Sequence, residues 1–176
     1  MTIKKTYKLL LLSLTLLVGL WGCKAYKFVD VSIPPDVKSI SIAPIENRAG
    51  YVNTQLSPRL TDRLRQKMIS QTKLRLITSG EADWEFSAEI TDYSFSTAGV
   101  GAGTGGRTVQ ASQSRLTIGI KITVYSNLEQ KSKDYTVTRT YDFPATQTIQ
   151  QVEQSRAEEM TKDLTDDMFN RIFSNW

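Results

Sequence analysis

The sequence predicts an α+β domain, a two-layer sandwich in which two helices pack on one face of a mixed four-stranded sheet. Several segments alternate apolar and polar residues, so each strand has a single apolar face for helices to cover. Two other segments place apolar residues at helical spacing. The last helix, of roughly 25 residues, would span about 37 Å, and strands of a dozen residues span about 40 Å. This helix can therefore lie along the whole sheet.

The first strand of the domain is predicted over Val37 to Ile45. Its apolar residues include Ile40 and Ile42. Pro44 cannot donate a backbone hydrogen bond, so it marks either the end of this strand or a position at a sheet edge. Residues 47–50 (Asn-Arg-Ala-Gly) then read as a turn.

A helix is expected from Ser57 to about Ser70. The Ser57 hydroxyl can cap a free backbone amide, and Pro58 suits the first helical turn. Apolar residues four apart form a stripe that should be buried, namely Leu60, Leu64 and Met68.

A basic stripe lies beside the apolar one and consists of Arg59, Arg63 and Lys67. One interpretation is a solvated face, or a set of salt bridges to a neighbouring helix. The other is a surface for an anionic partner. The sequence alone leaves both interpretations open.

A short strand is predicted over Leu74–Thr78, and the longer strands after it over Trp84–Phe95, Arg115–Tyr125 and Tyr135–Phe143. In Trp84–Phe95 the alternation slips by one residue, which predicts a bulge near Thr91-Asp92. Arg139 interrupts the apolar row of the last strand, and an edge position would let its side chain reach water. The helical pattern then returns from about Ile149 to Phe173.

The first 22 residues have the pattern of a secretion signal. Three lysines and no acid precede a mostly leucine core that is shorter than the roughly 20 residues of a membrane-spanning helix. Leu20-Trp21-Gly22-Cys23 resembles the lipobox of bacterial lipoproteins, which predicts cleavage between Gly22 and Cys23. Cys23 would then carry a diacylglycerol and a further acyl chain such as palmitate, which together hold a protein on a membrane. Residues 23–36 would be the lipidated tether of a single domain over residues 37–176.

The composition excludes several classes of function. Cleavage would remove three of the 22 basic residues and leave 19 against 18 acidic ones, so the net charge of +4 does not indicate nucleic-acid binding. The chain has no histidine and one cysteine, which removes Ser-His and Cys-His catalysis, the usual zinc sites and an internal disulfide. We therefore expect no enzyme, no catalytic residue, no metal and no cofactor.

Two patterns could indicate chemistry. Residues 98–108 contain Gly101, Gly103 and Gly106 in a G-x-G-x-x-G pattern, but a strand precedes and a strand follows, whereas phosphate binding needs a helix N-terminus after the loop. We interpret the segment as a connection between neighbouring strands. The acids Glu85, Glu89 and Asp92 could flank a groove as in glycosidases, yet nothing predicts the cleft that such a pair requires.

Several local strings occur in a definite order along the chain, namely Val37-Lys38-Ser39-Ile40-Ser41-Ile42, Asn47-Arg48-Ala49, Leu56-Ser57, Gln71-Thr72-Lys73-Leu74, Phe86 to Tyr93, Ser114-Arg115-Leu116-Thr117 and Phe169-Asn170-Arg171 to Trp176. Together with the lipobox and the order of elements, these strings resemble the LptE family of lipopolysaccharide-assembly lipoproteins. The resemblance covers nearly all of the chain after the signal, and the order of the strings makes it specific.

The resemblance implies an αβ domain that is anchored to the periplasmic side of the outer membrane. It also implies a partner, the β-barrel LptD, in which the domain acts as a plug and helps lipopolysaccharide to reach the cell surface. Lipid A phosphates would need basic side chains, for which the candidates by position are Arg107, Arg115, Lys131 and Lys133.

A second hypothesis is a periplasm-facing lipoprotein that docks on and regulates an envelope enzyme, such as a peptidoglycan synthase. Such a partner would have to be reached across the periplasm. Only about 13 residues separate Cys23 from Val37, and they extend at most roughly 45 Å. The short tether favours a partner in the same membrane.

Overall fold

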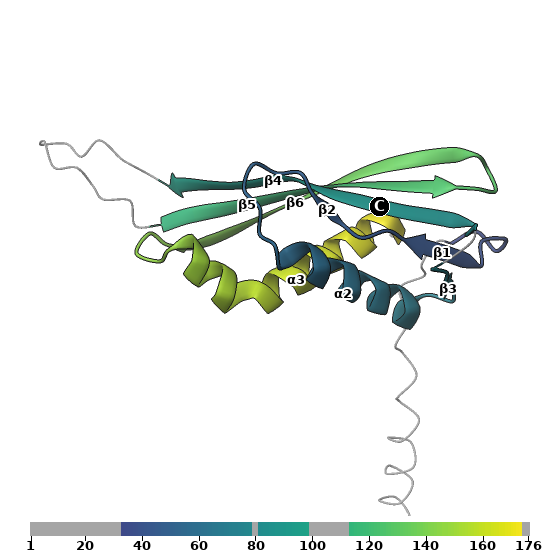
Figure 1. The fold of residues 1–176 in the computed structure, drawn as a ribbon, viewed down its shortest axis with the longest axis horizontal. Helices are drawn as coiled ribbons and strands as arrows, with labels where there is room; N and C mark the ends of the chain where they lie inside the picture. Colours follow the sequence, from purple (N-terminus) through teal and green to yellow (C-terminus); the bar gives the residue numbers. More distant parts are fainter. Residues whose placement is uncertain (1–32, 79–80, 99–112, 174–176) are drawn as a thin grey trace, which may run out of the picture. The chain divides into compact units, whose positions relative to one another are not determined.

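The computed structural model describes residues 33–78, 81–98 and 113–173, all within one compact unit, Val31–Trp176. Within these ranges, two helices and a mixed six-stranded sheet confirm the α+β class (Figure 1). The elements in chain order are β1 (Ser39–Ile42), β2 (Glu46–Asn47), α2 (Leu56–Gln71), β3 (Arg75–Leu76), β4 (Trp84–Ala98), β5 (Gln113–Ser126), β6 (Lys131–Pro144) and α3 (Ile149–Phe173). The signal, Cys23, most of the tether, Arg107 and all but the first residue of the glycine-rich segment lie outside the described residues.

The prediction of four strands is wrong, because the sheet has six. Its order is β3-β1-β4-β5-β6, and β2 also pairs with β4. The strand expected over residues 37–45 is interrupted at Pro44, after which the chain resumes pairing as β2. The amide of Arg48 donates to the carbonyl of Ile90 (2.9 Å), so the expected turn lies against β4. Strands β1, β2 and β3 pair in parallel, whereas β4, β5 and β6 are antiparallel.

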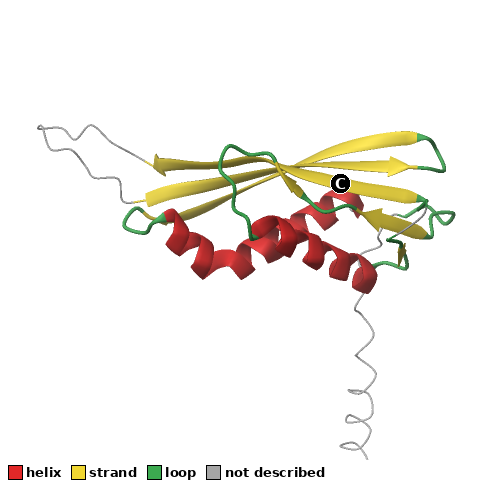
Figure 2. Cartoon of the chain, viewed as in Figure 1, coloured by secondary structure: helices red, strands yellow, loops and turns green. Residues whose placement is uncertain are grey.

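The core lies on the side of the sheet where Figure 2 shows both helices. Strand β5 alternates as predicted, with fully buried Leu116, Ile118, Ile120 and Ile122. The apolar stripes of α2 and α3 are also buried, with Leu60, Leu64 and Met68 on one helix and Met160, Leu164 and Met168 on the other. Lys121, Thr136 and Thr138 are exposed on the opposite face of the sheet.

The bulge expected near Thr91-Asp92 is confirmed. The register between β4 and β5 shifts between Ile90 and Asp92, and Asp92 pairs with Gly119. At the other end of β5 the turn is shorter than predicted, because β6 begins at Lys131 rather than near residue 135. Gln130 closes this turn with a positive φ of 54°.

The start of α2 differs from the prediction. The residue before the helix is Gln55, and the side-chain oxygen of Asn53 accepts hydrogen bonds from the amides of Gln55 (3.0 Å) and Leu56 (3.2 Å). Ser57 already lies inside the helix, and its hydroxyl is buried with no hydrogen-bond partner among the described residues. The expected Ser57 cap is therefore wrong, and Asn53 has that role.

Arg139 joins the edge strand β6 to α3. Its guanidinium is 3.0 Å from an Asp163 carboxylate oxygen and 2.7 Å from one of Asp167. The hydrogen bond to Asp167 is the main cause of a raised pKa for Arg139. The sequence suggested that Arg139 reaches water from an edge strand. The structure shows that it also pairs with two acidic residues of α3.

Candidate functional site

The structure separates the basic residues that the sequence singled out. Arg115 lies near the start of β5 and forms two hydrogen bonds with Asp142 of β6, at 2.6 and 3.0 Å. This pairing raises the pKa of Arg115 and lowers that of Asp142. The charge of Arg115 is therefore already matched by a carboxylate.

Lys131 and Lys133 lie at the opposite end of the same strand pair. In the strand register Lys131 lies opposite Ser126 and Lys133 lies opposite Val124. Val124 is nine residues after Arg115 along β5. At about 3.3 Å per residue the separation is roughly 30 Å. Because the two lysines are two residues apart on β6, they share one face of the sheet. The structure thus brings together two of the four predicted residues.

The two lysines line a groove of about 410 Å³, which we call the lysine groove. The residues that line it are Ile33, Pro34, Pro35, Trp84, Val124, Ser126, Glu129, Lys131, Lys133, Tyr135 and Ile172. They come from the segment before β1, from the start of β4, from the end of β5, the start of β6 and the turn between these two strands, and from the last turn of α3. Polar and apolar atoms contribute about equally to the wall. On its apolar side, Trp84 stacks at 6.2 Å on Phe173, the last residue of α3.

The arrangement suits an amphiphilic anion. Neither lysine forms an ion pair with another described residue, and Glu129 is the single acid among the lining residues. Two cations beside Trp84 and Ile172 could hold a charged head group while apolar atoms of the ligand contact the wall. The sequence pointed to the lysines but not to Trp84 or Ile172, which only the register of the sheet and the length of α3 bring beside them.

Comparison with known proteins places the chain in a family. Residues 37–172 match the LptE family, described as lipopolysaccharide-assembly. The chain belongs to the LptE family. The resemblance seen in the sequence is therefore confirmed over most of its length, and assembly of lipopolysaccharide is the function with which this family is associated.

No curated protein matches the sequence of this LptE-family chain. Solved structures that resemble it include the hypothetical protein CT253 from Chlamydia trachomatis, with a TM-score of 0.48, 10% identity, and coverage of 79% of this chain and 99% of that one. Lipoprotein GNA1162 from Neisseria meningitidis has a TM-score of 0.41 and 9% identity, covering 73% and 99%. XCC0632 from Xanthomonas campestris has a TM-score of 0.44 and 11% identity, covering 77% and 85%. These values are too low to support a conclusion about function.

The basic stripe of the LptE-family chain is mostly engaged within the fold. Arg63 pairs with Glu158 of α3, and Lys67 lies 2.6 Å from an Asp166 carboxylate oxygen. For these two residues the interpretation as salt bridges to a neighbouring helix is confirmed. Arg59, the third member of the stripe, instead donates to the side-chain oxygen of Gln55 at 3.2 Å.

The acidic residues considered for catalysis do not form a pair. Glu85 accepts a hydrogen bond from Asn127 (2.8 Å), and Glu89 lies 3.2 Å from Arg48. Asp92 is exposed and contacts the hydroxyl of Ser94 at 3.3 Å. Within the described ranges, no group of three acidic or other metal-binding side chains is close enough to hold a metal ion. Neither described helix is long and apolar enough to cross a membrane.

Proposed function

We propose that this chain is a non-enzymatic outer-membrane lipoprotein, lipidated on Cys23, that is the plug and assembly partner of an LptD-type β-barrel. Its domain, a two-layer αβ sandwich, would help to pass lipopolysaccharide to the cell surface from the periplasmic side. The observation that carries this proposal is the match of residues 37–172 to the LptE family. The lipobox at Cys23 supports the anchor.

The lysine groove supports a direct role in handling lipopolysaccharide. Lipid A is an amphiphile with phosphates and acyl chains, and the groove combines Lys131 and Lys133 with apolar side chains such as those of Trp84 and Ile172. Ammonium groups that have no carboxylate partner are available to phosphate oxygens. We therefore propose the two lysines as contacts for lipid A. Arg115, which is paired with Asp142, is a weaker candidate than its sequence position suggested.

The sheet face opposite the helices supports a place inside a polar barrel lumen. Its charged side chains are balanced by neighbours, as in the pairs Arg48–Glu89, Lys121–Asp134 and Arg115–Asp142. The threonines at 136, 138 and 140 add exposed hydroxyl groups to this face. Such a mixed and nearly neutral coat suits a water-filled, polar interior.

Co-purification tests the proposed partner. The full-length chain with an affinity tag at its C-terminus would be isolated from detergent-solubilised outer membranes, and the bound proteins identified by mass spectrometry. We expect a large outer-membrane β-barrel in stoichiometric amount. A single-pass peptidoglycan synthase in its place would support the regulatory hypothesis. Unchanged surface lipopolysaccharide after depletion of the chain would contradict the proposal.

A further inference from the structure

A second pocket lies far from the lysine groove. It has a volume of about 230 Å³ and lies between the segment Tyr51–Leu56, the start of α2 and the first half of α3. Four carboxamide side chains line it, those of Asn53, Gln55, Gln150 and Gln154, and we call it the amide pocket. From Gln150 to Ile172 of the lysine groove, α3 runs 22 residues, or about 33 Å.

The amide pocket lies beyond the end of a row of ion pairs between α2 and α3. Lys67 pairs with Asp166, and one turn earlier in α2 Arg63 pairs with Glu158. One turn earlier again, Arg59 lines the pocket together with Gln150, Glu153 and Gln154 of α3, but Glu153 is hydrogen-bonded to Tyr93 and Tyr51 and forms no ion pair with Arg59. Arg59 has no carboxylate within ion-pair distance among the described residues, and its one hydrogen bond there goes to Gln55.

On the other side of the pocket, the carboxylate of Glu153 is a hydrogen-bond acceptor held in place by two tyrosines. The hydroxyl of Tyr93 donates to Glu153 at 2.7 Å, and that of Tyr51 lies 3.4 Å from the second carboxylate oxygen. Asn53 in turn donates to Tyr93 at 3.2 Å. Tyr51 and Tyr93 also stack at 5.3 Å. Glu153 is thus fixed in position, and because a carboxylate has about four acceptor sites, it retains sites for a ligand.

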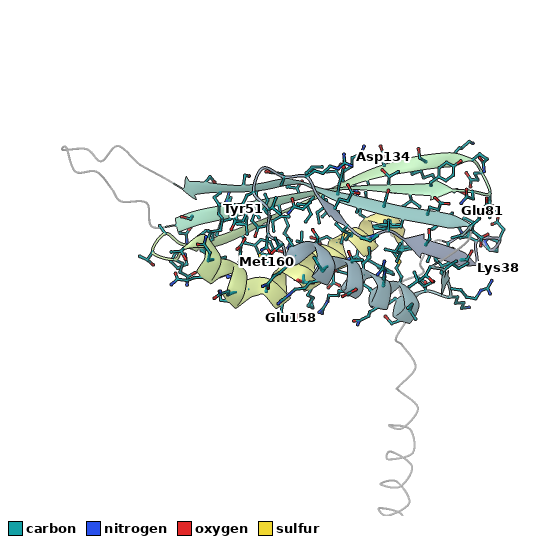
Figure 3. The ribbon with its side chains drawn as sticks, viewed as in Figure 1. Lys38, Tyr51, Glu81, Asp134, Glu158 and Met160 are labelled. Carbon is teal, nitrogen blue, oxygen red and sulfur yellow. The ribbon has the colours of Figure 1, made fainter. Side chains whose placement is uncertain are left out.

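The size of the pocket depends on a small residue. Ala157 lies one helical turn after Glu153 and is among the lining residues, with Leu56 and Met160 beside it (Met160 and Tyr51 are labelled in Figure 3). A longer side chain at position 157 would occupy the space. The volume is below the roughly 300 Å³ at which sites for drug-sized ligands begin, so it suits a ligand of about one ring.

We propose that the amide pocket binds a single neutral sugar ring or a similar polyol. Carboxamides both donate and accept hydrogen bonds without charge, which matches hydroxyl groups, since these also do both. Arg59 can donate to a ligand hydroxyl and Glu153 can accept from one. Because these two residues carry opposite charges, the pocket does not favour an anion. This inference does not rest on the function proposed above.

Saturation-transfer NMR tests the site directly. The full-length lipidated chain would be prepared in a detergent without a sugar head group and mixed with methyl glycosides of glucose, galactose and N-acetylglucosamine. We expect saturation of at least one glycoside. Ala157→Leu should abolish it, and Gln154→Ala or Arg59→Gln should weaken binding about tenfold, through lost hydrogen bonds.

Two controls keep the result interpretable. Ala145→Leu adds the same side chain at an exposed turn position and should leave the signal unchanged, as should the double variant Lys131→Ala/Lys133→Ala of the lysine groove. The proposal is overturned if no glycoside shows saturation. It is also overturned if Ala157→Leu and Gln154→Ala both leave the signal intact, or if inorganic phosphate and acetate compete with the glycoside at equal concentration.

Discussion

At the scale of single residues, Asp83 ties the start of β1 to the turn before β4. One carboxylate oxygen accepts hydrogen bonds from the amides of Lys38 and Ser39 and from the Ser39 hydroxyl, each at 2.8 Å. The bond from the Lys38 amide is the largest cause of a lowered pKa for Asp83. The ionised form is therefore favoured by the fold, and its contribution to stability depends on pH.

We expect Asp83→Asn to be less stable than the parent at pH 7. Because the pKa is lower in the folded state, the contribution is present above the unfolded value of about 3.9 and is lost as the pH falls through the folded value. The difference in free energy of unfolding should therefore shrink at acidic pH. Urea unfolding from pH 7 to pH 3 measures it, with exposed Asp62→Asn as the control. A difference independent of pH would contradict this interpretation.

Arg139 makes a second prediction at this scale. It donates to Asp167 and lies beside Asp163, both partly buried on α3. Arg139→Ala would leave two neighbouring carboxylates without their cation, and should cost about 1 to 2 kcal/mol in the free energy of unfolding. Arg115→Ala breaks a more exposed pair on the sheet surface and should cost less than about 1 kcal/mol. Equal costs in denaturant unfolding would contradict the linking role of Arg139.

At the scale of elements, the periodicity of apolar residues predicted the long strands and helices. The alternation of β5 and the helical spacing of α3 are long and regular, and the predicted bounds of α3 agree with the structure. Strand β2 was missed because two residues carry no period, and only pairing with β4 defines it. The start of β6 was assigned to the turn because its first four residues are polar and all exposed, so they show no alternation of apolar and polar positions.

Burial of its apolar face in the core should dominate the stability of α2. Leu64 is fully buried in the core, whereas Ile69 on the same helix is 57% exposed. We expect Leu64→Ala to lower the free energy of unfolding by about 3 kcal/mol, within the usual 2 to 5. Ile69→Ala should change it by about 0.5 kcal/mol or less. Denaturant unfolding compares the two, and similar losses would show that the buried face of α2 is wrongly assigned.

The bulge in β4 makes a prediction about Gly119. An added Cβ at this position would lie 3.1 Å from the Cβ of Asp92 and 3.5 Å from the Thr91 hydroxyl oxygen. Gly119→Ala should therefore push the bulge away from β5 and cost about 1 to 3 kcal/mol. Gly50→Ala adds the same methyl where nothing lies within 4 Å, and should be close to neutral. Thermal unfolding of both variants checks this, and a neutral Gly119→Ala would contradict the described packing.

At the scale of the whole molecule, the candidate site could be predicted only in part. Lys131 and Lys133 were proposed as contacts for lipid A phosphates because of their position in the polar connection between two predicted strands. Their apolar neighbours Trp84 and Ile172 are distant in sequence and meet them only through the sheet register and the length of α3. Arg115 was proposed from its place near the glycine-rich segment, but pattern alone could not reveal its pairing with Asp142.

The amide pocket had no signal in the sequence at all. Its glutamines look like ordinary polar positions of a surface helix, and Glu153 reads as one more solvated acid. Only the fold places them opposite Asn53 and Arg59, about a hundred residues earlier. Sites built from such residues depend on which side chains face each other across elements, and periodicity carries no information about that.

Photo-crosslinking in intact cells tests whether the lysine groove contacts lipopolysaccharide. A benzophenone amino acid would replace Tyr135, which lines the lysine groove, and in a matched strain Thr136, exposed on the opposite face of β6. If the groove handles lipopolysaccharide, position 135 should cross-link to it strongly and position 136 weakly or not at all. Equal labelling at both positions, or no lipopolysaccharide at position 135 in cells that hold the chain in the outer membrane, would contradict the proposed function.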